Sequence, residues 1–191
     1  MTKSDLKDYL IKALTYRSRT SYKFYFLLSL IDISKKKDTV FLKECGINML
    51  VLSWNDLSDP ENHYPNLDKL KRYKVDLMKR FNLSEYSTEK EVKKALKDND
   101  DKQVNRIAYE LTLYCPYLFL SIGQWDKRLK GIINYHERHK LIQEFSQQES
   151  CLYEIYDEKI ILNSEFFDII RNNIEEFNEL VKSELKTYLR K

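Results

Sequence analysis

The sequence predicts a mainly α-helical protein: a single globular helical domain of about seven helices, with one small β-hairpin before a long C-terminal helix. Glycine and proline occur only three times each in 191 residues, which disfavours tight turns and strand-rich meanders. Apolar residues recur at spacings of three and four along most of the chain, as on one face of a helix. A content of 42% hydrophobic and 33% charged residues is typical of a folded chain rather than a disordered one. Because no repeat or linker divides the sequence, we expect residues 1–191 to form one domain.

The first three predicted helices cover about residues 4–15, 21–32 and 40–54. The second is apolar or aromatic on every face between Tyr22 and Ile31, as expected for a helix buried on most sides. We therefore expect it to be the central core helix, with its main core residues at Phe24, Leu27, Leu28 and Ile31. The third helix is expected to pack beside it.

Residues 55–66 contain Pro60 and Pro65 and are predicted to form a loop. A helix over residues 67–81 should follow, with leucines on one side and a basic arc on the other. Two capped helices, at about 88–98 and 101–114, come next, and the second should end at Cys115-Pro116 because a residue before proline avoids helical geometry. Another helix is expected at about 132–145.

The end of the sequence predicts two further elements. Residues 152–156 and 159–162 alternate around Asp157-Glu158, which indicates a hairpin over about 152–162. From Ser164 to about Arg190, apolar residues continue at helical spacing, so a single terminal helix of roughly 40 Å is expected over about 164–190.

Several function classes lack the residues that they require. The chain has no cysteine pairs at zinc-ligand spacing, no phosphate-binding glycine loop and no dinucleotide fingerprint. His136 and His139 are three residues apart, but two ligands do not make a metal site. We therefore assign no catalytic residue, no metal and no cofactor, and we expect the chain by itself not to be an enzyme.

The cysteines and the apolar runs bear on location. Cys45, Cys115 and Cys151 are odd in number and far apart, which suits reduced thiols in the cytoplasm. The strongest apolar run, Phe24 to Ile31, is far shorter than the ~20 residues of a membrane span, so no membrane association is expected.

Charge is distributed unevenly and points to a basic working face. Residues 151–191 hold 6 Lys and Arg against 9 Asp and Glu, and residues 1–150 hold 27 against 21, which gives net charges of −3 and +6. Basic residues precede the core helix, where the helix N-terminus favours anions, and the helix at 67–81 carries the best basic arc. The candidate nucleic-acid-binding residues, with DNA or RNA as partner, are Arg17, Arg19, Lys23, Lys69, Arg72, Lys79 and Arg80. The competing interpretation is that such a lysine-rich face simply solvates its helix.

A family resemblance adds a direction for function. The stretch TSYKFYFLLSLID, Thr20 to Asp32, resembles the opening helix of uncharacterised bacterial HNH endonuclease-type proteins, whose helical N-terminal region precedes the nuclease unit. The segments Ile47–Trp54 and Cys115–Leu120 and the hairpin followed by the terminal helix are also similar to that group. Family members continue into a nuclease unit, whereas this sequence ends at Lys191, so no catalytic residue is carried over from the family.

Three hypotheses follow. The first is a non-catalytic recognition or regulatory domain of an HNH nuclease-type protein, with a role in antiviral defence, that binds nucleic acid through its basic face. The second is a protein-binding adaptor, the middle component of a multi-protein bacterial defence system with a nuclease or ATPase partner, because such components also open with an aromatic and leucine-rich helix. An adaptor should expose an apolar patch, for which the terminal helix is one candidate. The third is an enzyme whose site is a deep polar pocket with perturbed acids or histidines. The oligomeric state stays open at this point.

Overall fold

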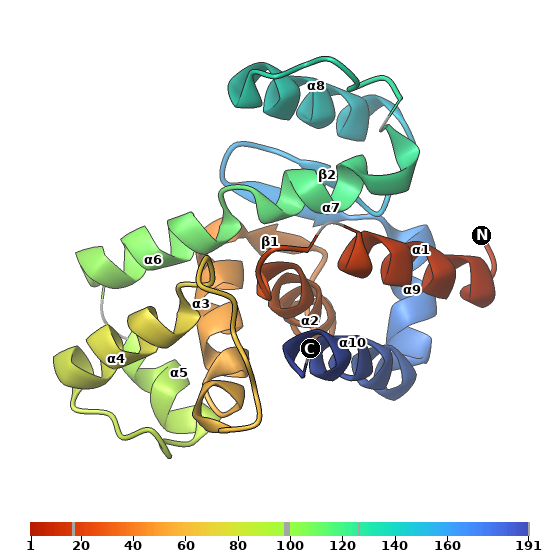
Figure 1. The fold of residues 1–191 in the computed structure, drawn as a ribbon. Coiled ribbons are helices and arrows are strands. Elements are labelled where there is room, and N and C mark those ends of the chain that lie inside the picture. Colours follow the sequence, from red (N-terminus) through yellow and green to blue (C-terminus); the bar gives the residue numbers. More distant parts are fainter. Residues whose placement is uncertain (17, 98–99, 126, 191) are drawn as a thin grey trace.

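The structure is a computed structural model that describes residues 1–16, 18–97, 100–125 and 127–190. It is mainly helical, with a small antiparallel sheet near its centre (Figure 1). The helices are α1 (Lys3–Thr15), α2 (Tyr22–Ser34), α3 (Leu42–Ser53), α4 (Leu70–Phe81), α5 (Glu89–Lys97), α6 (Lys102–Thr112), α7 (Cys115–Gln124), α8 (Tyr135–Gln148), α9 (Ser164–Asn172) and α10 (Ile174–Leu189). A short 3-10 turn, Asp56–Ser58, lies in the loop after α3. The predicted fold class is confirmed.

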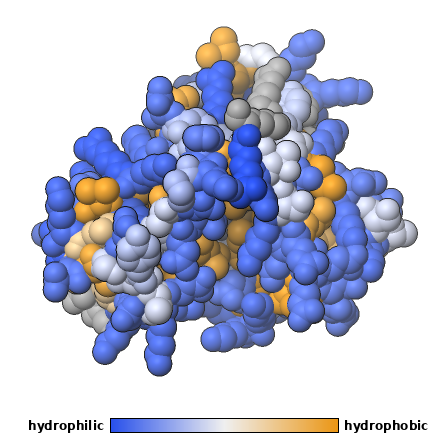
Figure 2. Space-filling model, turned by 60° about the horizontal axis from the view of Figure 1, so that its bottom comes forward, coloured by the Kyte–Doolittle hydropathy of each residue, from blue (hydrophilic) through white to orange (hydrophobic). Residues whose placement is uncertain are grey.

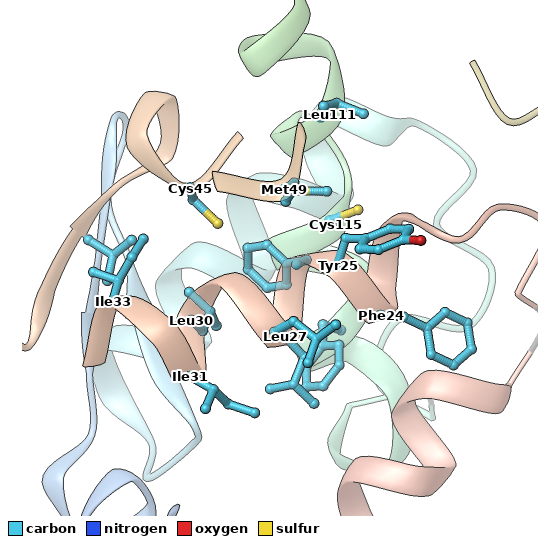
Figure 3. Close-up of a cluster of buried hydrophobic side chains, with 14 of the residues drawn as sticks. Phe24, Tyr25, Leu27, Leu30, Ile31, Ile33, Cys45, Met49, Leu111 and Cys115 are labelled. Carbon is cyan, nitrogen blue, oxygen red and sulfur yellow. The ribbon is translucent and has the colours of Figure 1, made fainter. Parts of the chain in front are cut away.

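Helix α2 is the centre of the core, as the sequence predicts. It packs against α3, α7, α9 and α10, and the predicted core residues Phe24, Leu27, Leu28 and Ile31 are all buried. Figure 3 shows side chains of α2 with Cys45 and Met49 of α3 lying close to them. At the edge of this cluster the Tyr25 hydroxyl reaches polar partners in the loop, Asp56 at 2.9 Å and Tyr64 at 2.8 Å. The core helix therefore also holds the long loop before α4.

The sheet has one more strand than the predicted hairpin. Strands β2 (Tyr153–Ile155) and β3 (Lys159–Leu162) form the hairpin, and β1 (Thr39–Phe41) pairs antiparallel with the other side of β3. In this register Val40 lies opposite Ile160. The prediction that a helix begins at about residue 40 is therefore wrong by two residues, because Thr39, Val40 and Phe41 complete the sheet before α3 starts at Leu42.

The predicted long C-terminal helix is present as α10, but it does not extend over 164–190 as one helix. The chain leaves helical geometry at Asn173, where φ is −136° and ψ is 40°, so α9 and α10 are separate helices. The Asn173 side-chain amide donates to the Ile169 carbonyl at 2.9 Å. Asparagine is unfavourable inside a helix because its side chain can hydrogen-bond to nearby backbone groups in this way, in competition with the helical hydrogen bonds. With 16 residues, α10 spans about 24 Å instead of the predicted 40 Å.

Helix α7 begins where the sequence predicts that its predecessor ends. Pro116 lies in the first turn of α7, where its missing N–H needs no partner within the helix. The three cysteines are free and buried, which agrees with the expectation of reduced thiols. Within the described part of the chain, no helix is long and apolar enough to cross a membrane.

Candidate nucleic-acid interface

The predicted basic arc lies on α4. Leu70, Tyr73 and Leu77 face the core, whereas Arg72, Lys79 and Arg80 are exposed on the other side. Asn82 ends the helix in the left-handed conformation, at φ 52°, which asparagine adopts more readily than most residues. The amphipathic pattern of the sequence therefore identified the helix from Leu70 onward and its outer face, but the predicted start at residue 67 is wrong: Leu67 lies before the helix and is 63% exposed.

Helix α6 lies alongside α4 in the opposite direction, and two ion pairs join their ends. Lys69, just before α4, is 3.6 Å from Glu110 near the end of α6. At the other end, Arg80 contacts Asp101, the N-cap residue of α6, at 2.6 Å. Figure 1 shows the two helices on the same side of the molecule. We call their shared outer face the α4–α6 surface; its basic residues are Lys69, Arg72, Lys79, Arg80, Lys102 and Arg106.

Sequence reasoning missed two members of this surface, Lys102 and Arg106. They lie four residues apart on α6, and Glu110 follows at the same spacing, so the three share one face. The signal was present in the sequence, since this face lies opposite the buried Val104, Ile107 and Leu111. It was overlooked because single cations spread along a helix do not form a cluster until a second helix lies beside them.

The α4–α6 surface carries more positive than negative charge. Arg106 contacts Glu110 at 3.7 Å, so Lys69, Arg80 and Arg106 each have an acidic partner. Hydrogen bonds hold two acids of this surface in the ionised form: the Tyr73 hydroxyl, followed by Lys69 and Arg106, lowers the pKa of Glu110, and Arg80 lowers the pKa of Asp101. A third acid, Asp76 of α4, is four residues from both Arg72 and Arg80 and forms no ion pair among the described residues. Arg72, Lys79 and Lys102 have no ion-pair partner among the described residues. These three cations are the unpaired charge of the surface.

The structure places the other predicted basic residues elsewhere. Arg17 lies outside the described residues. Arg19 is exposed and lines a different pocket, together with Tyr64, Leu67 and Tyr188. Lys23 is buried, and its ammonium donates to the carbonyls of Ala13 at 2.7 Å and Tyr16 at 2.8 Å at the C-terminal end of α1. Lys23 is thus a buried helix cap and not part of an exposed basic face.

The start of α2 holds a carboxylate of the protein itself. The Ser21 backbone N–H and hydroxyl both donate to Asp68, at 2.7 and 2.6 Å, and a second oxygen of Asp68 accepts from the Leu70 N–H. Burial raises the pKa of Asp68, and the hydrogen bonds from Ser21 oppose this rise. The anion predicted at this helix N-terminus is therefore supplied by the loop before α4, and a phosphate would have to displace it.

One member of the histidine pair, His139, belongs to an aromatic cluster. His139 stacks on Tyr117 with ring centroids 3.9 Å apart and an interplanar angle of 5°, and burial lowers its pKa. In the described ranges no group of three or more His, Cys, Asp and Glu side chains lies close enough together to hold a metal ion.

The lower face of the molecule bears on the adaptor hypothesis. Figure 2 shows mostly hydrophilic side chains there, with apolar ones in patches between them. The apolar residues Phe177, Val181, Leu185 and Leu189 of α10 are buried, and none of the exposed large hydrophobic residues of the described chain lies on α9 or α10. The terminal helices are therefore not the apolar patch that an adaptor requires.

Comparisons of the chain with protein-family models, with curated proteins and with solved structures gave no match.

Proposed function

We propose that this chain is a non-catalytic domain that binds the phosphate backbone of DNA or RNA through the α4–α6 surface. The observation that carries the proposal is the excess of unpaired cations, Arg72, Lys79 and Lys102, on a surface whose other basic residues, Lys69, Arg80 and Arg106, are paired with acids. Most contacts between proteins and nucleic acids go to phosphates, and they position the protein without reading the bases.

The layout of these cations suits a polymer better than a single small anion. Arg72 and Lys79 are seven residues apart on α4, which corresponds to about 10 Å along the helix axis. Lys102 is next to Asp101, which Arg80 binds at the far end of α4. The unpaired charge therefore extends along the surface and does not converge on one point.

The resemblance of Thr20 to Asp32 to bacterial HNH endonuclease-type proteins suggests a setting for this binding. In that setting the domain would recognise nucleic acid, or regulate its cleavage, for a nuclease-type defence protein. Support for this part of the proposal comes from the sequence alone.

The salt dependence of binding tests the proposal. Each phosphate contact on duplex DNA releases counterions, so three contacts predict a slope of roughly −2.7 for the logarithm of affinity against the logarithm of salt concentration. Fluorescence anisotropy with labelled duplex DNA and single-stranded RNA, over a series of salt concentrations, measures this slope. Arg72→Glu/Lys79→Glu should weaken binding to every nucleic-acid sequence tried. It should also make the salt dependence shallower, with a slope between zero and about −1.

A control of equal charge change separates the α4–α6 surface from net charge. Lys12 on α1 and Lys186 on α10 are exposed and have no ion-pair partner in the part of the chain that the structure describes, and Figure 1 shows their helices on the other side of the molecule. Lys12→Glu/Lys186→Glu should leave most of the affinity and the salt slope unchanged. Absence of binding at low salt, or equal loss in both variants, would overturn the proposal.

A further inference from the structure

An open apolar groove lies where β1, α3, α6 and the β2–β3 turn meet. Its volume is about 730 Å³, and Phe41, Leu42, Ile47, Tyr109 and Thr112 line its floor and walls. Phe41 and Tyr109 are 51% and 62% exposed. Large apolar side chains exposed together on a surface mark an interaction site more often than a single exposed one does.

One end of this groove is negatively charged. The other ionic groups at its rim are neutralised within the chain: Lys43 pairs with Asp100 at 2.9 Å, and Glu44 pairs with Lys37 at 2.6 Å and with Lys97 at 4.0 Å. Asp157 and Glu158, in the β2–β3 turn, have no cationic partner among the described residues. An occupant should therefore offer a large apolar side chain with a cation close to it.

The same chain carries a segment with this chemistry. Ile133, in the loop between α7 and α8, is 91% exposed and is the most exposed of the large hydrophobic residues. Lys127 and Lys130 precede it and are exposed, with no ion-pair partner in the described part of the chain. Arg128 is already paired with Glu149. We call residues 127–133 the Ile133 loop.

The groove and the Ile133 loop lie in the same half of the molecule. Tyr135, two residues after Ile133, contacts Tyr114 with ring centroids 5.7 Å apart, and Tyr114 follows Tyr109 of the groove by five residues. The groove and the Ile133 loop are complementary in chemistry, and this placement allows a two-fold dimer. In such a dimer the Ile133 loop of each copy would bind in the groove of the other copy. Such an arrangement closes after two copies and does not form chains.

We propose that the occupant of the groove is a second copy of this chain, with Ile133 on Phe41 and Tyr109 and the loop lysines beside Asp157 and Glu158. The interface would be apolar at its centre and charged at its rim, as is common in protein–protein interfaces. Higher salt should weaken the dimer, because the charged contacts lie at the solvent-exposed rim.

Sedimentation velocity over the micromolar range tests the proposal directly. The unmodified chain should be a monomer–dimer mixture whose dimer fraction rises with concentration. Ile133→Lys should raise the dissociation constant about tenfold or more, and Asp157→Lys/Glu158→Lys should do the same. The matched control is Leu67→Lys, because Leu67 is also exposed, at 63%, but lines a different pocket. This control should leave the dimer unchanged.

Disulfide trapping identifies the contact itself. The natural cysteines are all buried, so new exposed cysteines dominate oxidation. Phe41→Cys/Ile133→Cys should give a covalent dimer under mild oxidation, whereas Leu67→Cys/Ile133→Cys should not do so above the level of Ile133→Cys alone. A chain that stays monomeric throughout the concentration range, or a dimer that is indifferent to Ile133 and does not crosslink to position 41, would overturn the proposal. None of these measurements involves nucleic acid, so their result is separate from the test of the α4–α6 surface.

Discussion

Lys23 illustrates how a residue's role depends on what lies above its helix. In the sequence it follows two arginines at a helix start, which predicts an anion-binding side chain. The structure buries it to 6% exposure under the end of α1, where it donates to two carbonyls. Since α1 and α2 meet only after folding, the sequence pattern near Lys23 contains no sign of this burial. Among the described residues, no other helix covers Arg72 and Lys79, and both are exposed on the outer face of α4, as the pattern predicts.

The buried ammonium of Lys23 should make stability depend on pH. Burial lowers the pKa of Lys23 to about 8, against about 10.4 in an unfolded chain. Between these values the unfolded state binds the proton and the native state does not, so the free energy of unfolding rises with pH. The neutral amine still has two N–H groups for its two carbonyl partners. The shift corresponds to a gain of about 3 kcal/mol at most.

Urea unfolding of the unmodified chain and of Lys23→Met, at several pH values from 7 to about 10.5, measures this effect. Methionine keeps the length of the side chain but cannot titrate, so the difference between the two proteins isolates Lys23 from the other groups that titrate in this range. The difference should grow with pH in favour of the unmodified chain. A difference that stays constant across the window would show that Lys23 keeps its ordinary pKa.

Among the elements, those with local signals could be predicted and those that depend on distant partners could not. Helices α2 and α4 have clear periodic patterns, and the β2–β3 hairpin has an alternating one. Strand β1 has only three residues, and it is a strand because Val40 pairs with Ile160, 120 positions away. The break between α9 and α10 had a local signal in the pair Asn172-Asn173, but the apolar period continues across it and outweighed that signal.

The contact between α3 and α6 gives a prediction at this scale. These helices cross so closely at Gly46 that a Cβ atom there would lie 2.4 Å from the Ala108 carbonyl oxygen and 2.6 Å from its Cα. Gly46→Ala should therefore force the helices apart and lower the free energy of unfolding by about 1 to 3 kcal/mol. Ala108→Gly should not restore it, because the clash is with backbone atoms.

Two variants make this test specific. Gly131→Ala is a comparison without steric contact: nothing lies within 4 Å of its added Cβ, and only its φ of 89° opposes the substitution. Chemical denaturation of the single variants and of Gly46→Ala/Ala108→Gly gives the three free energies. A loss below about 0.5 kcal/mol at Gly46, or recovery in the double variant, would mean that α3 and α6 do not meet so closely.

At the scale of the whole molecule, one buried cluster reaches from Leu6 of α1 to Leu189 of α10. Two contacts join the C-terminal helix α10 to distant parts of the chain: Lys3 of α1 pairs with Glu176 at 3.0 Å, and the N–H of His63, in the loop before α4, donates to the Leu189 carbonyl at 2.8 Å. Leu77 of α4, Leu111 of α6 and Leu129 of the Ile133 loop all belong to this cluster, so binding at either site should be measured with the whole chain.

The continuous core predicts that the chain unfolds in a single transition. Chains beyond about 150 residues often unfold through intermediates, so the length of this chain alone does not predict a single transition.

The two tryptophans are placed to test this prediction: Trp54 lies at the end of α3, Trp125 at the end of α7, and both are 1% exposed within the cluster. In Trp54→Phe the fluorescence reports on the α7 end, and in Trp125→Phe it reports on the α3 end. Within each variant the midpoint of fluorescence should coincide with that of far-UV circular dichroism in the same urea series, since losing either end exposes the shared core. A fluorescence midpoint clearly separate from the helical one in either variant would divide the chain into two units that unfold independently, and the continuous core would then not act as one cooperative structure.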